Sequence, residues 1–577
     1  MTDPLTKYCR ADTPLPKRQR VWPLYGAGFD HLGQDGAPIE APVPEIGPGE
    51  LLVRHDAVGL CFSDIKVIKA GQEHPRIYKN MQTDPVVLGH EVTLTVVKVG
   101  ADLGSRYKPG DRFIVQADIF VGGVGYAYGY ELQGGLSQYN KLDERVLAGD
   151  DGCYLIPVRP STGYAESALT EPWACVTAAY ELKYRSSLKP NGTTWILGGA
   201  GTPERAYTIS AGFDESAHPA RLLLSNVPAH FAGWLRQRCA SLGVELIDAP
   251  DAANPPVDLV DDIVVLGADA DLIERVSPHL AAHGILAILA EQPLPRKLNL
   301  DVGRIHYNRW VYVGGQGPDI ARAYADLPVR SMLKPGGRAW FVGAGGPMGH
   351  MHVQRAIQVA GHPGTIVCTE MNQMRVDELC EAFAGEAAAN GIEWVCLNAL
   401  NREEYQAKMA EFREGGFDDI VVLAPVPAAI NEAVDYLAPE GVMNIFAGLN
   451  RGAMAAIDLS GAYLKGERFI GQSASTIADL RFMLDQAESG KLSPNRSVAA
   501  VGSLGAARDG LRAVHDALFP GKVVIYPQIK DFPLTALSGL KEKLPSVWAR
   551  LKDGRMWTVE AEQEFLRLML PDLQNEP

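Results

Sequence analysis

Four residues in the first third of the chain have the types that hold a catalytic zinc ion. Cys61 lies in GLCFSD, His90 and Glu91 lie in VVLGHE, and Glu171 lies in LTEPWACV. A zinc ion that acts as a Lewis acid takes thiolate, imidazole and carboxylate ligands and keeps one position open for a substrate oxygen. Glu171 strengthens the pattern, because an unpaired carboxylate in an apolar, helix-forming segment is costly to bury. Together they predict a catalytic metal site, although each alone is more often a core or surface residue.

A second group of residues has the pattern of a dinucleotide-binding turn. AWFVGAGGPMGHMHVQRA places glycines between a strand-like and a helix-like run, where a pyrophosphate can approach backbone N–H groups. Glu370 ends the next strand-like run, where its carboxylate would bind ribose hydroxyls and repel a ribose phosphate, which favours NAD over NADP. The predicted cofactor-binding residues are Gly343, Ala344, Gly345, Gly346, Pro347, Met348, Gly349, Glu370 and Arg375.

The elements that must position these groups change in kind along the chain. From Pro44 to about Asp150, short β-branched runs are divided by glycine and proline, which predicts a barrel-like all-β unit. After Thr170, strand-like runs alternate with longer amphipathic stretches, which is typical of βαβ units and a parallel sheet. Near Leu492 strand-like runs return (RSVAAVG, GKVVIYP), and a polar helical tail follows them. These late strands could join the first β unit, but their pattern does not show it.

An internal repeat divides the α/β region into two copies. DDIVVL occurs at 261–266 and again at 418–423, and the same offset of 157 residues aligns HGILAILAE with EGVMNIFAG and YVGGQGPDI with FIGQSASTI. A repeat unit of this length indicates domain duplication rather than a solenoid. The two copies span roughly 191–330 and 335–495, and each is expected to form its own parallel sheet.

The first copy departs from the dinucleotide pattern. WILGGAGTPERAY keeps Gly199 and Gly201 but has Glu204 near the position of close helix–strand packing, and ARLLLSNV ends in Asn226 instead of an acid. Both changes weaken dinucleotide binding. We therefore expect the 335–495 copy to hold NAD and the 191–330 copy to be structural or degenerate.

The order of these motifs resembles the zinc-dependent medium-chain dehydrogenase superfamily, and within it the sorbitol dehydrogenases and the polyol-phosphate and sorbose-phosphate enzymes. The resemblance rests on Cys-x-Ser-Asp, Gly-His-Glu, Pro-Gly-Asp-Arg at 109–112, Glu-Pro, and a glycine-rich strand-turn-helix. It implies a GroES-like catalytic domain, a Rossmann domain, and zinc on Cys61, His90 and Glu171. Glu91 would be either a fourth ligand or a residue just behind the metal.

The resemblance also implies a proton path, and it has two departures. Ser63 matches the hydroxyl that passes the substrate proton outward, although a turn-capping serine would fit the same position. Lys66 stands where many relatives have a histidine, and could instead meet ribose or an anionic substrate. Residues 113–140 contain no cysteine, so no structural zinc site is expected. Three tyrosines of this stretch could line the substrate cleft or could pack in the core: Tyr126, Tyr128 and Tyr130.

The fold class expected from these patterns is α/β, with a GroES-like β-barrel catalytic domain and two tandem Rossmann domains of doubly wound parallel sheet. The predicted domains are 1–190, completed by about 496–530, then 191–330, 335–495 and a helical extension at 531–577. The last strands of the two copies, 309–315 and 468–474, are expected to cover one another, because exposed sheet edges leave backbone groups unpaired. Such an intramolecular pseudo-dimer leaves a further homo-oligomer open.

The composition excludes several other classes of protein. The chain of 577 residues has a net charge of −15 and no long block of lysine and arginine, which argues against a nucleic-acid partner. It has no apolar stretch that could span a membrane, and the N-terminus lacks the apolar run of a secretory signal. Eight scattered cysteines favour free thiols. A cytoplasmic protein is expected.

These predictions converge on a zinc-dependent oxidoreductase that transfers a hydride between NAD and a polyol or sugar. Ser63, Lys66 and Glu91 are the residues expected to assist catalysis around the single zinc ion. A sugar-phosphate or polyol-phosphate substrate is the first alternative. A zinc- and nucleotide-binding scaffold without turnover is the second.

Overall fold

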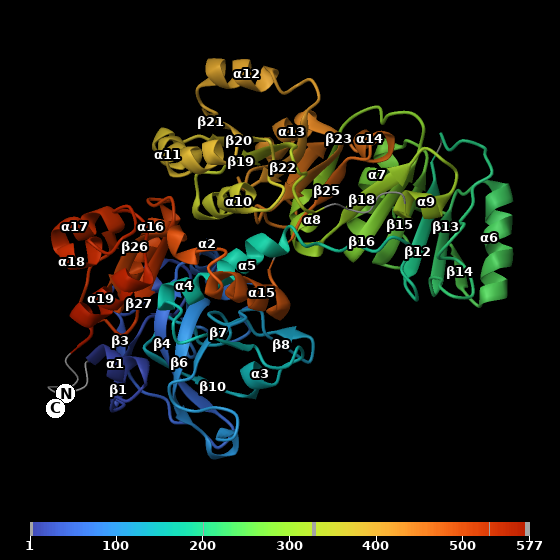
Figure 1. Ribbon diagram of the computed structural model, residues 1–577. Coiled ribbons are helices and arrows are strands. Elements are labelled where there is room, and N and C mark those ends of the chain that lie inside the picture. The colour runs from blue at the N-terminus through green and yellow to red at the C-terminus, as the bar shows by residue number, and fades with distance from the viewer. Residues whose placement is uncertain (1–3, 200, 326–330, 473, 530, 572–577) are drawn as a thin grey trace. The chain divides into compact units, whose positions relative to one another are not determined.

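The computed structural model describes residues 4–199, 201–325, 331–472, 474–529 and 531–571 (Figure 1). The chain divides into two compact units. The first unit comprises Met1–Ala178, Gly346–Met351 and Ala474–Pro577, and the second comprises Ala179–Gly345 and His352–Ser473. Among the residues outside the description are the ends of the domains expected at 191–330 and 531–577, and Ser473 of the second predicted edge strand.

The first unit is built on a sheet whose strands come from both ends of the chain. Within the described residues, β27 pairs antiparallel with β4, and β26 pairs parallel with β27, so the late strand-like runs join the N-terminal β unit. β4 is buried along its whole length, and the charged Arg54 and Asp56 in its middle form a buried ion pair. In spatial order the path is β11 (Leu155–Pro157), β7 (Arg112–Val115), β6 (Glu91–Val99), β4 (Leu51–Gly59), β27 (Lys522–Tyr526), β26 (Val498–Ser503) and β28 (Thr535–Ala536), with β10 (Tyr139–Leu142) also on β4.

The C-terminal extension packs on this unit through its last helix. The Glu562 carboxylate accepts hydrogen bonds from the backbone N–H groups of Tyr164 (2.5 Å) and Ala165 (2.7 Å) and from the Tyr526 hydroxyl (2.8 Å). Glu562 therefore satisfies backbone donors at the start of α4, which a helix cannot satisfy internally. The helices of the unit include α2 (Phe62–Ala70), α4 (Tyr164–Ala168), α5 (Thr170–Ala178), α15 (Ile477–Glu488), α16 (Ala507–His515), α17 (Leu540–Lys543), α18 (Pro545–Trp548) and α19 (Val559–Met569).

The second unit contains two parallel sheets of identical strand order. Sheet 1 runs β14 (Glu245–Asp248), β13 (Arg221–Ser225), β12 (Thr193–Gly198), β15 (Val260–Leu266), β16 (Leu280–Leu289) and β18 (Val311–Gly315). Sheet 2 runs β21 (Glu393–Asn398), β20 (Thr365–Glu370), β19 (Arg338–Val342), β22 (Phe417–Val422), β23 (Leu437–Ile445) and β25 (Arg468–Ile470). In both sheets the first strand along the chain lies in the middle. The second and third strands are added on one side of it and the later strands on the other side, as in a doubly wound sheet.

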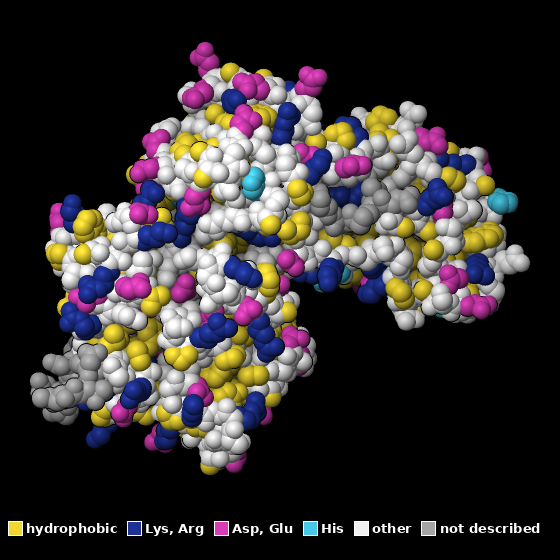
Figure 2. All heavy atoms as spheres, in the orientation of Figure 1, with side chains coloured by type: hydrophobic (Ala, Val, Ile, Leu, Met, Phe, Trp, Pro, Cys, Tyr) yellow, Lys and Arg dark blue, Asp and Glu magenta, His cyan; other side chains and the backbone are white. Residues whose placement is uncertain are grey.

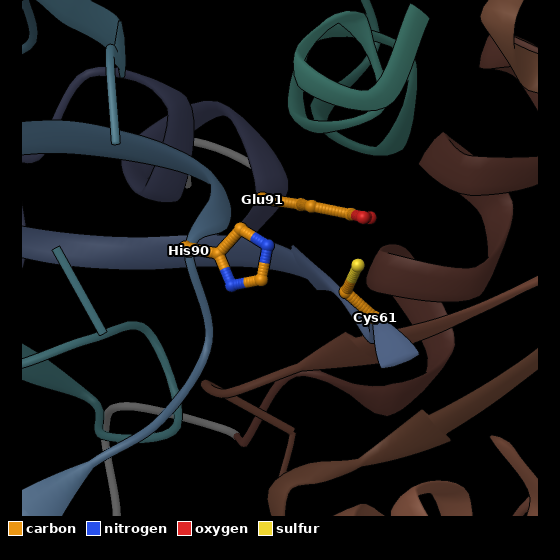
Figure 3. Close-up of side chains that lie close together, drawn as sticks. All are labelled: Cys61, His90 and Glu91. Atoms are coloured by element: carbon orange, nitrogen blue, oxygen red, sulfur yellow. The ribbon is translucent and has the colours of Figure 1, made fainter. Parts of the chain in front are cut away.

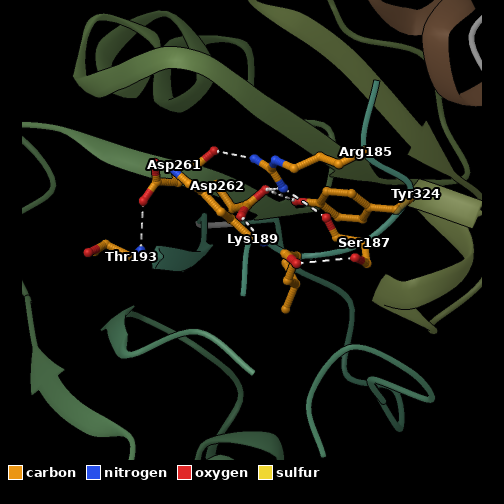
Figure 4. A network of polar contacts seen from close by, with 8 residues as sticks. Arg185, Ser187, Lys189, Thr193, Asp261, Asp262 and Tyr324 are labelled. Atoms are coloured by element: carbon orange, nitrogen blue, oxygen red, sulfur yellow. Dashed lines mark hydrogen bonds and ion pairs between the residues drawn. The ribbon is translucent and has the colours of Figure 1, made fainter. Parts of the chain in front are cut away.

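A polar contact of the same design closes each sheet at the start of its first strand, and Figure 4 shows the one in sheet 1. In sheet 1, the Lys189 N–H donates to Asp262 (2.8 Å) and the Lys189 ammonium pairs with Asp261 (2.6 Å). In sheet 2, the Lys334 N–H donates to Asp419 (2.7 Å) and its ammonium pairs with Asp418 (2.6 Å). The motif LKP precedes both strands, at 188–190 and 333–335, and was missed in the sequence because its offset is 145 residues rather than 157. We name this contact the lysine–aspartate clasp.

The buried tryptophan of each first strand repeats the correspondence. The Trp195 indole N–H donates to the Ser225 hydroxyl (2.8 Å), and the Trp340 indole N–H donates to the Thr369 hydroxyl (3.0 Å). Buried indole groups need such a partner, because an unpaired N–H in the core is costly. The two sheets therefore share internal hydrogen bonds as well as strand order.

The two sheets differ in the helices that connect their strands. Sheet 2 has a helix after each of its first four strands: α10 (Pro347–Gln358), α11 (Gln373–Ala389), α12 (Arg402–Ala410) and α13 (Pro427–Ala433). In sheet 1 the described residues between β12 and β13 form no helix, so the helix that the glycine pattern at Gly199 suggested is absent. Sheet 1 has α6 (Ala229–Leu242) and α7 (Ala270–Val276) after its second and fourth strands.

The two sheets meet through an antiparallel strand pair with symmetric register. β17 (Leu298–Asp301) pairs with β24 (Met454–Ile457), so that Leu298 faces Ile457 and Leu300 faces Ala455. Because Ala455 and Ile457 lie 157 residues after Leu298 and Leu300, exchanging the copies reproduces the pairing, as in a two-fold interface.

Helices beside the outer strands follow the same symmetry. A Cβ at Gly314 of β18 would lie 2.6 Å from Tyr463 Cβ of α14 (Ser460–Leu464), and one at Gly471, after β25, would lie 2.8 Å from His306 Cα of α8 (Val302–Asn308). β18 and β25 are neighbours, and within the described residues they do not hydrogen bond into one sheet. The close backbone approach at the two glycines places the helices against the strands.

The surface in Figure 2 carries lysine and arginine interspersed with aspartate and glutamate. The described cysteines are all free thiols. Within the described part of the chain, no helix is both long enough and apolar enough to cross a membrane.

Candidate metal and cofactor sites

Three of the predicted metal ligands are brought together by two neighbouring strands of the first unit. Cys61 follows β4 and is the N-cap of α2, while His90 and Glu91 stand at the start of β6, which pairs with β4. Their ligand atoms, the Cys61 sulfur, a His90 ring nitrogen and a Glu91 carboxylate oxygen, all lie within 4.8 Å of one another (Figure 3). The structure therefore assembles a thiol, an imidazole and a carboxylate from residues 30 positions apart.

Asp64 orients two of these groups and was missed as a site residue. Its carboxylate accepts from the Cys61 N–H (2.9 Å) and the Gly89 N–H (3.3 Å), and it contacts His90 Nδ1 at 3.2 Å. A carboxylate on the far nitrogen of a histidine ligand fixes the ring and its tautomer. Asp64 is fully buried and stands three residues after Cys61, a spacing visible in the Cys-x-Ser-Asp motif.

Glu91 is held by a buried lysine from the C-terminal strands. Lys522 of β27 forms an ion pair with Glu91 Oε1, and both side chains are almost completely buried. Burial lowers the pKa of Lys522, but Glu91, Cys61 and Glu171 outweigh it and hold that pKa above its usual range. The other carboxylate oxygen, Glu91 Oε2, is buried and has no hydrogen bond partner among the described residues. This orphaned oxygen is the observation that most directly favours a cation at the site.

Glu171 lies close to the three ligands but outside their group. It stands in the first turn of α5, and burial raises its pKa to about 7 while the neighbouring His90 opposes the shift and Glu91 adds to it. Its Oε1 accepts a hydrogen bond from the Cys175 thiol at 3.8 Å. The prediction that Glu171 is the third ligand stays a prediction, because the group within 4.8 Å consists of the other three residues.

Ser63 and Lys66 lie on α2, directly after Cys61. The helix is capped by Cys61 and Asp64, so Ser63 does not serve as its cap. No hydrogen bond to the Ser63 hydroxyl occurs within the described residues. Lys66 is partly buried, one turn further along the helix. Ser63 therefore does not have the capping role that was the alternative to a role in proton transfer.

The three tyrosines of the glycine-rich stretch divide between core and site. Tyr128 is a core residue that hydrogen bonds to His55 (2.7 Å) and Asn140 (3.1 Å). Tyr130 stacks on His90, with ring centroids 5.9 Å apart, so it forms a wall of the metal site. Tyr126 meets Tyr78 edge to face. Tyr128 and Tyr130 are both buried, so the packing alternative holds for them, while a place at the substrate cleft stays a prediction.

The glycine-rich turn of sheet 2 has the backbone geometry that close packing requires. Gly343 follows β19 with φ +80°, and a Cβ there would lie 2.8 Å from Ala424 Cβ. The Gly345 N–H donates to Glu370 Oε2 at 3.1 Å, and a Cβ at Gly345 would lie 2.7 Å from that oxygen. Ala344 is buried behind the turn, and α10 begins at Pro347 and includes Met348 and Gly349. Gly346 has open space around it.

Glu370 stands at the end of β20, where the sequence placed it. Its carboxylate also accepts from the Met371 N–H (2.7 Å), and the Arg375 N–H is bonded to the Asn372 side chain in the first turn of α11. Three apolar side chains near this edge of sheet 2 are more than half exposed: Met371, Met374 and Leu400. An apolar ring bound beside Glu370 would cover such side chains.

The matching position of sheet 1 is a pocket lined by acids. It has a volume of about 190 Å³ and lies at the ends of β12 and β15, with Asp269, Asp271 and Arg296 in its walls. Asp269 crowds the glycine turn, because a Cβ at Gly199 would lie 2.3 Å from its carboxylate oxygen. A carboxylate beside the turn repels a pyrophosphate, and the missing helix removes the N-terminus that would bind one.

Comparison with known proteins finds a matching domain model and several similar enzymes. The model of the alcohol dehydrogenase GroES-like domain matches residues 47–151, which hold Cys61, His90 and Glu91. A mannitol-1-phosphate 5-dehydrogenase of Aliivibrio fischeri is 22% identical over 91% of this chain and 93% of its own. An L-sorbose 1-phosphate reductase of Klebsiella pneumoniae is 26% identical over 48% of this chain and 71% of its own. These similarities support the resemblance to the zinc-dependent medium-chain dehydrogenases, and the GroES-like domain is matched over residues 47–151.

One solved structure of the superfamily shows how far the fold agrees. The 2R,3R-butanediol dehydrogenase of Bacillus subtilis matches 88% of this chain and 99% of its own, with a TM-score of 0.51 and 15% identity. This likeness concerns the fold alone. The relatives described above are named as a dehydrogenase and a reductase, which agrees with the class of enzyme that the motif order predicted.

Proposed function

We propose that the chain is a zinc- and NAD-dependent dehydrogenase of polyols or sugars, with Cys61, His90 and Glu171 as metal ligands. The observation that carries the proposal is the group of Cys61, His90 and Glu91 ligand atoms within 4.8 Å, with a buried Glu91 oxygen that lacks a partner. Thiolate, imidazole and carboxylate donors fit zinc. Lys522 occupies the other Glu91 oxygen, so Glu91 has one carboxylate oxygen left to offer the metal, either as a fourth ligand or from just behind it.

A zinc ion bound here would lower the pKa of a substrate hydroxyl and polarise a carbonyl. The protein's own groups would do the rest. Asp64 holds the Cys61 backbone and the His90 ring in position, and Tyr130 covers the imidazole face. The Ser63 hydroxyl would relay the substrate proton outward, and Lys66 on the same helix would stand at the outer end of that path. A bound nicotinamide would supply the hydride chemistry at the substrate carbon.

We assign NAD to sheet 2. Gly343 and Gly345 allow the turn to pack closely, Gly346 has open space where a pyrophosphate could approach the start of α10, and Glu370 is placed for ribose hydroxyls. A carboxylate at this position favours NAD over NADP. In sheet 1, Asn226 stands in place of the acid and Asp269 crowds the turn, which supports a structural role for that sheet.

We also infer that the two sheets are tandem Rossmann domains that arose by duplication and pair as an intramolecular pseudo-dimer. The repeated lysine–aspartate clasp, the repeated tryptophan hydrogen bonds and the symmetric β17–β24 register support this inference. The 496–530 segment and the 531–577 extension would then complete and cover the catalytic domain.

Metal analysis and NADH absorbance over a panel of polyols and sugars test the proposal. We expect close to one zinc per chain, reduction of NAD by at least one polyol, and loss of both metal and turnover in Cys61→Ser. Retained zinc without turnover of any hydroxylated compound would favour a binding scaffold. Turnover that survives Cys61→Ser would overturn the assignment of the metal.

A further inference from the structure

The wall of the metal site continues outward from His90 as a stack of rings with a cation beside it. Tyr130 lies between His90 and His74, with centroid distances of 5.9 Å and 5.3 Å and nearly parallel planes. The Arg76 guanidinium approaches the same tyrosine ring, 5.8 Å from its centroid. His90 and Arg76 therefore contact one aromatic ring, which places a cation one ring away from a metal ligand.

Arg76 is held in place by a neighbouring acid. Its Nη1 forms an ion pair with Asp118 at 2.5 Å, and both side chains are partly exposed. The Arg76 N–H donates to His74 Nδ1 (3.4 Å), so the proton of a neutral His74 is on Nε2. The described residues provide no hydrogen bond to Arg76 Nε or Nη2. Arginine has five donors in a fixed plane, so those groups remain available to a second anion.

His74 offers a second donor beside Arg76. Burial lowers the pKa of His74, and the Arg76 and Lys66 charges lower it further, which favours the neutral ring that donates from Nε2. Asp118 is the carboxylate that faces Arg76. The Arg76 guanidinium and the His74 Nε2–H therefore offer donors to an anion next to the metal site, and guanidinium groups bind phosphate through such donors.

We propose that Arg76, with His74, binds the phosphate of a polyol or sugar phosphate whose reacting carbon lies at the Cys61–His90 metal site. The inference rests on the proposed function and narrows its substrate to the phosphorylated class. Arg76 donates from Nε and Nη2 and His74 donates from Nε2, while Asp118 keeps the guanidinium plane fixed. The two relatives named for phosphorylated substrates are consistent with this chemistry.

The test compares polyols with their terminal phosphate esters in the zinc-loaded enzyme. We expect wild type to prefer the phosphate, and Arg76→Gln to lower kcat/KM for the phosphate by about 10- to 100-fold, mostly through KM. The same variant should change kcat/KM for the free polyol less than about threefold. Arg145→Gln is the matched control, because Arg145 also pairs with an aspartate, Asp143, and lies over a tyrosine, Tyr126.

A binding measurement separates this inference from the proposed function. With NAD present to fill the dinucleotide site, inorganic phosphate should raise the melting temperature of wild type and of Arg145→Gln but not of Arg76→Gln. Equal preference of wild type for both substrates, or an equal loss on both in Arg76→Gln, overturns the inference. If wild type turns over neither compound, the proposed function fails, and a phosphate shift retained in Arg76→Gln overturns the phosphate site as well.

Discussion

The backbone N–H of Lys189 donates a hydrogen bond to the buried carboxylate of Asp262 at 2.8 Å, and this contact ties the segment before β12 to the fourth strand of sheet 1. Arg185 and Tyr324 donate to the other oxygen of the same carboxylate, at 2.7 Å and 3.0 Å. Three segments of the chain thus converge on one acid in the middle of the sheet. Such a carboxylate is costly to bury alone and is stabilised only while its partners are in place.

We therefore expect Asp262→Ala to lower the free energy of unfolding by about 3 kcal/mol, because it leaves Arg185 without its buried partner. Asp261→Ala is the control, since Asp261 pairs with the half-exposed Lys189 ammonium, and it should cost about 1 kcal/mol. Urea unfolding followed by tryptophan fluorescence measures both. Equal losses in the two variants would contradict the importance of the buried acid.

Lys522→Met tests the pairing behind the metal site. Removing the ammonium leaves Glu91 as a buried carboxylate without a cation, so we expect a loss of about 3–5 kcal/mol in the zinc-free protein. The double variant Lys522→Met, Glu91→Gln removes both charges and should recover much of that loss. Unfolding in the presence of a chelator provides the measurement. A single variant as stable as wild type would show that the pair contributes nothing.

Gly314→Ala probes the contact between the two sheets. A Cβ at this position would lie 2.6 Å from Tyr463 Cβ and 2.3 Å from the Ile288 carbonyl oxygen, so we expect a loss of about 2–3 kcal/mol from overpacking. Gly317→Ala, three residues later, meets no atom within 4 Å and should leave the stability unchanged. Thermal unfolding distinguishes them, and similar melting temperatures would argue against close packing at Gly314.

Glu370→Ala should weaken NAD binding roughly tenfold, which corresponds to about 1.4 kcal/mol, and should affect NADP less. The substitution removes the carboxylate that would bind the ribose hydroxyls and that accepts a hydrogen bond from the Gly345 N–H. Asn226→Ala changes the matching position in sheet 1 and should leave the affinity for NAD as it is. Titration calorimetry with both dinucleotides is the measurement. A weakening in Asn226→Ala as large as that in Glu370→Ala would move the cofactor to sheet 1.

Glu166 makes the stability of the first unit depend on pH. Burial raises its pKa to about 7, and the carboxylates of Glu562, Glu488 and Glu560 add to the shift, while the Gly163 N–H opposes it. Since the folded-state pKa lies above the ordinary value of 4.5, the stabilising contribution is complete below about pH 4.5 and is lost as the pH rises to about 7.

Glu166→Gln keeps the neutral form at every pH. We expect it to match wild type near pH 5 and to exceed it near pH 8 by at most about 3 kcal/mol, measured by urea unfolding. A difference in the free energy of unfolding that does not vary with pH would contradict this assignment.

The sequence was most informative where chemistry and pattern are local. Cys61, His90 and Glu91 were placed correctly near one another because each stands at a strand end, where the sheet brings neighbours together. The partner of Glu91 could not be predicted, because Lys522 lies 431 residues away and the strand pairing that connects them has no local signal. The absence of a helix after Gly199 could not be predicted, because the same glycine pattern also occurs in irregular turns.

The lysine–aspartate clasp shows a different limit. The LKP motifs are 145 residues apart, whereas the paired aspartates are 157 residues apart. The first copy is therefore twelve residues shorter between the lysine and the aspartates, and a repeat with one fixed offset does not include the lysine. The three-dimensional contact is nevertheless the same in both sheets.

The symmetric β17–β24 pairing has a consequence for how this interface responds to mutation. In a dimer of identical subunits, one substitution at a two-fold contact appears on both sides at once, and its cost is doubled. Here the two sides are encoded separately, so Tyr463 can face Gly314 while His306 faces Gly471. The covalent tether keeps the partners at high effective concentration and fixes their ratio at one to one. Each half of the contact is therefore free to diverge without imposing the same change on the other.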